Sequence, residues 1–96
     1  MGAAPPDARR ASLQIRNKLG LHARAAAMLV RTANSFDAEV SIAKDGQVVN
    51  GRSIMGVMML AAEQGSEIAV TTTGPQAAES LDAIRALVEA RFHEPE

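Results

Sequence analysis

The chain has 96 residues, 47% of them hydrophobic, and it carries a formal net charge of -1 with no cysteine. This length and apolar content suffice for one compact domain with a single core. The scattered basic residues and the near-zero charge argue against a nucleic-acid or membrane partner, and the lack of cysteine excludes disulfide bonds, thiolate zinc sites and cysteine nucleophiles.

The two ends of the chain differ in composition from its middle. Residues 1–9 are rich in Ala and Pro and show no period, so we expect a flexible leader there, a folded domain over residues 10–92 and a tail over residues 93–96. No stretch has the apolar character of a secretory signal or the length of a membrane-spanning helix. We therefore expect a cytoplasmic protein.

Apolar periodicity predicts the elements of the first half of the domain. Residues 13–16 alternate between apolar and polar side chains, which is typical of a strand. Residues 23–33 place apolar side chains at i, i+3, i+4 and i+7, which predicts a helix from Ala23 to Ala33. Residues 39–42 and 48–49 flank the pair Asp45-Gly46, which favours a type I′ turn, so this region is predicted to form a β-hairpin.

The second half of the domain continues with a short helix, a strand and a longer helix. Ser53 stands where a helix cap is expected, ahead of the apolar segment 54–62, and Gly65 is a suitable terminator. Residues 68–72 alternate as a fourth strand, and residues 77–92 show helical spacing. This order of elements predicts an α+β fold, in which helices cover one side of a four-stranded antiparallel sheet. The expected core face of the short helix consists of Val57, Leu60 and Ala61.

His22 precedes the first predicted helix, and Arg24 lies in its first turn. A helix N-terminus leaves backbone N–H groups unpaired and disfavours positive charge, so it can hold an anion and favours a neutral, nucleophilic imidazole. The guanidinium of Arg24 suits bidentate contact with phosphate oxygens. Together these groups are suited to accept a transferred phosphoryl group, although each residue taken singly is more typical of a solvated helix end.

Several segments carry a resemblance to a known family. GLHARAAAMLV, NGRSIMGVMMLAAEQG and the region from EIAVTTTG to LDAIRALVEARF are similar to HPr, the histidine-containing phosphocarrier family of the phosphoenolpyruvate-dependent phosphotransferase system. FDAEV and TTTGPQ further resemble the nitrogen-branch paralogue NPr. The resemblance covers nearly the whole predicted domain and implies an open-faced β-sandwich of βαββαβα order with three helices.

The resemblance also implies relay of a phosphoryl group rather than enzymatic turnover. His22 would be phosphorylated at Nδ1 by phosphorylated enzyme I or its nitrogen-branch counterpart, and would pass the group to a histidine of an EIIA protein. Arg24 would accompany the phosphoryl group, with the backbone N–H groups of Ala23, Arg24 and Ala25 as further donors. No metal or organic cofactor is implied, and we expect a monomer with neither nucleic acid nor membrane as a partner.

Two positions add to the implied site. The family pattern is His-x-Arg-Pro, and this chain has Ala25 in place of the proline, so an extra N–H is present in the first turn. Without the rigid proline, the free energy of unfolding should be lower by roughly 0.4 to 1 kcal/mol. Ser53 is predicted to cap the second helix, and the resemblance adds a regulatory phosphorylation there by HPr kinase/phosphorylase.

One face of the two predicted helices is expected to serve as a docking face. It combines a second stripe on the first helix with the side of the second helix that turns away from the core. Methionines also fill irregular gaps in cores, but exposed ones adapt to several partner surfaces, which a carrier needs. The expected docking face consists of Ala27, Arg31, Ile54, Met55 and Met58.

Other classes of function fit the sequence less well. An RNA-binding domain of similar order would need aromatic side chains on its strands, whereas the two aromatic residues, Phe36 and Phe92, lie outside the predicted strands. A phosphohistidine hydrolase or mutase would need a general acid or base near His22, which the local sequence does not offer. A regulatory docking module that controls nitrogen or carbon metabolism is the alternative with the same fold. His93 is expected to be solvated and without a role.

Overall fold

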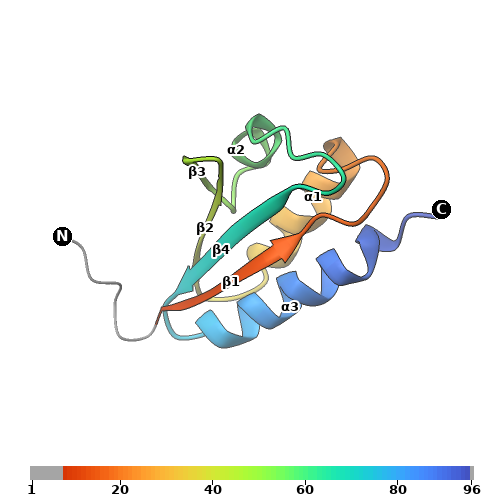
Figure 1. The fold of residues 1–96 in the computed structure, drawn as a ribbon. Coiled ribbons are helices and arrows are strands. Elements are labelled where there is room, and N and C mark those ends of the chain that lie inside the picture. The colour runs from red at the N-terminus through yellow and green to blue at the C-terminus, as the bar shows by residue number, and fades with distance from the viewer. Residues whose placement is uncertain (1–7, 96) are drawn as a thin grey trace.

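The computed structural model describes residues 8–95 as one antiparallel sheet with helices packed on it (Figure 1). The sheet has four strands in the order β1-β4-β2-β3, and the chain order is βαββαβα, which confirms the predicted α+β fold. The elements are β1 Arg9–Gln14, α1 Ala23–Ala33, β2 Glu39–Lys44, β3 Gln47–Asn50, α2 Ile54–Met59, β4 Glu67–Thr73, α3 Ala77–Glu89 and a short 3₁₀ turn, η1, at Arg91–His93.

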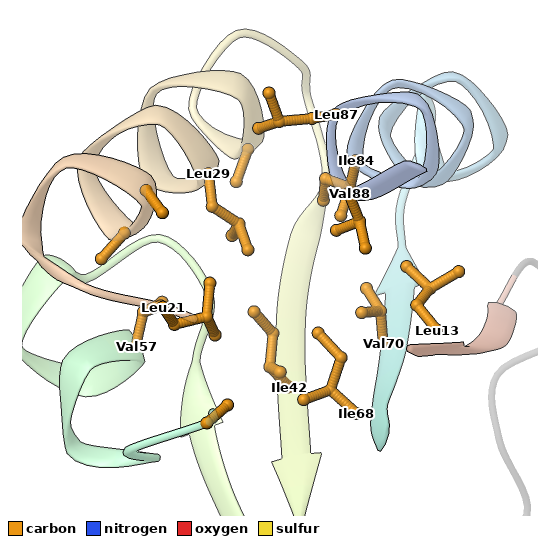
Figure 2. Packing of buried hydrophobic residues seen from close by; sticks show 14 of the residues in the cluster. Leu13, Leu21, Leu29, Ile42, Val57, Ile68, Val70, Ile84, Leu87 and Val88 are labelled. Carbon is orange, nitrogen blue, oxygen red and sulfur yellow. The ribbon is translucent and has the colours of Figure 1, made fainter. Parts of the chain in front are cut away.

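The core lies between the sheet and the helices (Figure 2). Strand β4 pairs with both β1 and β2, and this register places Leu13 opposite Ile68 and Ile42 opposite Val70. Because side chains alternate between the two faces of a strand, these four apolar residues point to the same side. Leu29 of α1 packs against them and is fully buried. Burying one such side chain contributes roughly 1.5–3 kcal/mol, so this layer holds the helices in place.

The hairpin between β2 and β3 has the predicted turn. Asp45 has a φ of 51° and Gly46 a φ of 83°. A type I′ turn requires positive φ at both central positions, which Gly adopts freely and Asp tolerates better than most residues. The turn brings Lys44 opposite Gln47 and fixes the register of the pair.

Helix α1 has the bounds that the sequence predicts, but the other two helices end earlier. Helix α2 stops at Met59 because Ala61 has a φ of 50°, which a right-handed helix does not allow. Ala61 is therefore exposed instead of lying on the core face, where Val57 and Leu60 are buried as expected. Gly65 falls in a later turn and does not end the helix.

The last helix was expected to reach Phe92, and this expectation is wrong. Helix α3 ends at Glu89, and Arg91, Phe92 and His93 follow with φ values of 56°, 53° and 57°. These left-handed residues end the α-helical path of the chain, and the side chain of Phe92 is fully buried. As Figure 1 shows, the C-terminal segment ends near the loop that enters α1.

The structured elements extend slightly beyond the expected domain of residues 10–92, and η1 includes His93 of the expected tail. Arg9 opens β1, one residue before the expected start, while residues 1–7 of the expected leader and residue 96 of the expected tail lie outside the described residues. Within residues 8–95, no helix has the length and apolar content to cross a membrane.

Candidate functional site

The loop between β1 and α1 approaches the segment after α2 at a glycine. Gly20 has a φ of 67°, and a Cβ on this residue would lie 2.4 Å from the backbone oxygen of Ala62. The next residue, Leu21, donates its N–H to the same oxygen at 2.9 Å. Only glycine combines this backbone conformation with so close an approach. Gly20 thus sets the position from which the chain enters α1.

His22 is the N-cap of α1, as the sequence predicts, with an extended backbone (φ -73°, ψ 179°). The first helical hydrogen bond runs from the N–H of Ala26 to the carbonyl oxygen of His22, at 2.8 Å. The N–H groups of residues 23–25 precede this bond and belong to the set that a helix leaves unpaired. In the described part of the chain, the His22 side chain makes no capping hydrogen bond to them. This end of the helix is therefore open to an anion.

The side chain of His22 is instead paired with the C-terminal segment. Its Nε2 lies 2.5 Å from Oε2 of Glu94, although 72 positions separate the two residues. The same Oε2 accepts a hydrogen bond from Nδ2 of Asn17 at 2.8 Å and lies 3.7 Å from Nη2 of Arg24. The side chain of Glu94 is only 6% exposed, whereas that of His22 is 28% exposed. One carboxylate oxygen therefore joins three side chains of the loop and of α1.

The surroundings of Glu94 favour its ionised form. Loss of hydration pushes the pKa of Glu94 upward, but other effects outweigh it and hold this pKa below its ordinary value. They are the hydrogen bonds from His22 and Asn17, the charge of His22 and a backbone hydrogen bond from Leu19.

Arg24 lies beside His22, as expected, and contacts the C-terminal turn. Its Nη2 donates to the carbonyl oxygen of Phe92 at 2.8 Å, and its Nη1 approaches Sδ of Met28 at 3.1 Å. Its side chain is about half exposed. The guanidinium thus stays accessible from solvent while it fastens the turn that carries Glu94.

Asn17 and Glu94 belong to the site but are not predicted from the sequence. Asn17 is fully buried, and its Nδ2 also donates to the carbonyl oxygen of Gly20 at 2.8 Å. A polar residue that continues the alternation of a strand into a buried position is a weak signal for such a role. Glu94 gave no signal, because it belongs to a segment without a period.

The five residues of the expected docking face are at least partly exposed. On α2, Met55 is 73% exposed, Ile54 43% and Met58 42%. On α1, Arg31 is exposed and Ala27 is half-buried. Two further apolar side chains, Leu19 and Met59, are exposed by 66% and 64% and were not predicted. The exposed surface of α2 is therefore largely apolar, because it consists mainly of the side chains of Ile54, Met55, Met58 and Met59.

Ser53 caps α2, as predicted. Its backbone is extended, and its Oγ accepts a hydrogen bond from the N–H of Gly56 at 3.2 Å.

Among the described residues, no group of three side chains is arranged to hold a metal ion. The site is thus built from an imidazole, a carboxylate, a guanidinium and an open helix end.

Comparison with known proteins assigns the family. The family model described as "PTS HPr component phosphorylation site" matches residues 9–90. The phosphocarrier protein HPr of Cupriavidus necator is 50% identical over 80 residues, which cover 83% of this chain and 90% of that protein. The chain belongs to the HPr family. Solved HPr structures agree with this assignment.

Two of these HPr structures cover most of the chain. The phosphocarrier protein HPr of Bacillus anthracis is 47% identical, with a TM-score of 0.81 over 84% of this chain and 96% of that chain. HPr-C-His of Thermoanaerobacter tengcongensis is 38% identical, with a TM-score of 0.88 over 92% of this chain and 99% of that chain. The HPr fold thus extends over the whole sheet and its helices.

Proposed function

We propose that the protein carries a phosphoryl group on Nδ1 of His22, as a member of a phosphotransferase system. The observation that supports this most directly is the position of His22 at the open N-terminus of α1, next to Arg24. An attacking imidazole needs a lone pair, and the phosphoryl oxygens need donors, which the N–H groups of residues 23–25 supply. Several relatives that match the chain are themselves named phosphocarrier proteins.

The donor is proposed to be phosphorylated enzyme I, or its nitrogen-branch counterpart, and the acceptor a histidine of an EIIA domain. Transfer breaks the bond between phosphorus and nitrogen in the donor and forms the same kind of bond at His22, so the reaction needs neither a cofactor nor water. Because both states have similar energy, the site should stabilise mainly the charge that the phosphoryl group carries during transfer. The protein is then a substrate of its partners and not a turnover enzyme.

The docking face is proposed to contact donor and acceptor in turn, with the chain as a monomer. Its exposed methionines can adapt to surfaces of different shape. Ser53 stands at the start of α2, next to Ile54 and Met55. A phosphate on Ser53, added by HPr kinase/phosphorylase, would place negative charge within this face and weaken binding to acidic partner surfaces.

Labelled phosphoenolpyruvate and enzyme I test the proposal directly. The wild-type protein should acquire an acid-labile, base-stable phosphoryl group, and His22→Ala should acquire none. The matched control is His93→Ala, which removes the other histidine of the chain from an exposed position and should be labelled like wild type. A wild-type protein that takes no label would favour the alternative, a regulatory docking module. Full labelling of His22→Ala would refute the assignment of the site.

A further inference from the structure

The contact between Glu94 and His22 restricts where the imidazole can hold its proton. An ionised carboxylate accepts hydrogen bonds and cannot donate them. Because Oε2 of Glu94 lies 2.5 Å from Nε2 of His22, that ring nitrogen must carry the hydrogen of the neutral imidazole. The other nitrogen, Nδ1, then has a free lone pair. Within residues 8–95, Nδ1 has no hydrogen-bond partner of its own.

We infer that Glu94 is a positioning residue, which holds His22 in the Nε2–H tautomer and thereby presents Nδ1 as the nucleophile. This inference rests on the proposed function, because it explains how the imidazole is prepared to accept a phosphoryl group. Carboxylates orient histidines in the same way in other sites where a histidine acts as a base or a metal ligand.

Asn17 keeps the carboxylate in place. Its Nδ2 has two acceptors, Oε2 of Glu94 and the carbonyl oxygen of Gly20, both at 2.8 Å. Turning the amide over would set its oxygen against both, so the orientation of the amide is determined by its partners. The described residues supply no partner for the buried Oδ1 of Asn17. A buried polar atom without a partner lowers stability, so Asn17 is better explained by its hold on Glu94 than by its contribution to the fold.

The C-terminal turn is built to deliver Glu94 to this place. Three successive residues with positive φ are unfavourable for L-amino acids and persist only where their surroundings enforce them. Here the ring of Phe92 is fully buried in the core, and Arg24 donates a hydrogen bond to the carbonyl oxygen of Phe92. The carboxylate is therefore held by packing and by hydrogen bonds, and not by the chance position of a loose end.

The charges balance during transfer with Glu94 in this role. The Nδ1 lone pair attacks phosphorus, and the bond to the donor nitrogen breaks. Its electron pair returns to the donor ring, which carries a hydrogen on its other nitrogen and therefore leaves as a neutral imidazole. The hydrogen on Nε2 stays where it is, so the phosphorylated ring becomes cationic. Glu94 then faces a positive imidazolium ring, and the hydrogen bond becomes charge-assisted. The contact is thus stronger after the phosphoryl group has arrived than before.

Nitrogen NMR of the unphosphorylated protein tests the tautomer. With ¹⁵N-labelled histidine and at a pH where both rings are neutral, His22 should be almost entirely the Nε2–H form. The exposed ring of His93 serves as a reference in the same spectrum. In Glu94→Ala the two forms of His22 should mix as they do in His93, whereas Glu94→Gln, which keeps an acceptor oxygen, should retain most of the preference. A His22 that is mixed in wild type, or unchanged in Glu94→Ala, would overturn the inference.

Single-turnover transfer from phosphorylated enzyme I tests the consequence. Glu94→Ala should slow phosphorylation of His22 roughly tenfold, the scale on which removing a partner that orients a histidine acts. Glu94→Gln should fall between Glu94→Ala and wild type, because it keeps the hydrogen bond and loses the charge. The matched control is Glu89→Ala, an exposed carboxylate on the last turn of α3, which should react like wild type.

The two hypotheses fail in different ways. If wild-type protein takes no phosphoryl group on His22, the proposed function is wrong, while the tautomer measurement still decides whether Glu94 positions the ring. If His22 is phosphorylated and Glu94→Ala reacts as fast as wild type, the proposed function stands and the positioning role is refuted.

Discussion

Helices α1 and α2 pack against each other, yet their first turns are completed differently. At α2, Oγ of Ser53 accepts a hydrogen bond from the N–H of Gly56, so the helix is closed by its own N-cap. At α1, the N-cap is His22, whose ring turns to Glu94 and leaves the first N–H groups to other acceptors. A capping oxygen stabilises a helix by about 1 kcal/mol, and α1 lacks this contribution. The first turn of α1 thus keeps donors that no side-chain cap binds, whereas the first turn of α2 is capped.

Giving α1 the cap of α2 is the strongest test of this difference. In His22→Ser, the serine oxygen can accept from the first turn, so the helix should be closed in the manner of α2. The substitution removes the imidazole, and we expect phosphoryl acceptance to fall to background while the fold is kept. Labelling with enzyme I measures the first effect, and a proton–nitrogen NMR spectrum checks the second. A variant that unfolds would show that the His22 ring, and not its backbone, supports α1.

A charge on the first turn of α2 tests whether that surface serves docking. Met55→Glu should slow transfer both from enzyme I and to an EIIA domain by about tenfold or more, because it places an unpaired charge in the centre of an apolar contact. Its thermal stability should stay unchanged, since the Met55 side chain is 73% exposed. Val48→Glu is the matched control, as Val48 is 66% exposed on β3, outside the docking face. Equal transfer rates for the two variants would refute the docking face.

The cap of α2 can be removed or charged, and the two changes should separate stability from transfer. Ser53→Ala should lower the free energy of unfolding by about 1 kcal/mol and leave phosphorylation of His22 unchanged. Ser53→Asp should keep or slightly raise stability, because a negative charge suits a helix N-terminus, and should slow phosphorylation by enzyme I several-fold.

Denaturant unfolding and single-turnover kinetics check both statements on Ser53. If Ser53→Asp accepts the phosphoryl group at the wild-type rate, negative charge at this position does not reach the partner surface. If Ser53→Ala is as stable as wild type, the hydrogen bond to Gly56 adds nothing to the fold.

Acid should weaken the contact between the Glu94 carboxylate and the N-cap residue of α1. The pKa of Glu94 is held below its ordinary value, so its ionisation stabilises the folded state above about pH 4.3, the ordinary value, and this contribution is lost as the pH falls through the lower pKa of the folded protein. The difference in unfolding free energy between wild type and Glu94→Gln should therefore shrink as the pH falls below about 4.3. The same comparison with Glu89→Gln should show no such change.

The smallest effect concerns the extra N–H of Ala25. Phosphorylation of His22 should shift the backbone amide signal of Ala25 about as strongly as those of Ala23 and Arg24, since all three precede the first helical hydrogen bond. Ala25→Pro should remove that contact and raise the free energy of unfolding by roughly 0.4 to 1 kcal/mol. An Ala25 signal that stays in place on phosphorylation would show that this N–H points elsewhere.

The sequence predicts those helices and strands whose apolar residues recur with a regular period. Alternation over residues 68–72 and the apolar spacing of residues 23–33 correspond to β4 and α1, because burial on one face imposes a period on each element. The pair Asp45-Gly46 predicts its turn, since few residues adopt positive φ twice in succession. The place of His22 at a helix start follows from the same local rules.

The sequence does not predict the parts that depend on irregular backbone and on distant contacts. Ala61 and the residues of η1 adopt positive φ without being Gly or Asn, so no residue preference announces where α2 and α3 end. Because the turn at Phe92 could not be foreseen, neither could the contact of Glu94 with His22. Periodicity shows which face of a helix or strand packs on the core. It carries no information on this contact, which joins residues at irregular positions of the chain.

The contact between His22 and Glu94 has a consequence for how the protein is made. Its partners lie 72 positions apart, so the ribosome completes β1, α1 and the hairpin well before the carboxylate exists. Contacts between such distant residues form late, after the loops between them have closed. The sheet is also completed late, because β4 lies between β1 and β2 and pairs with both. If Glu94 positions the imidazole as inferred above, His22 gains its orienting partner only once residue 94 has been added to the chain.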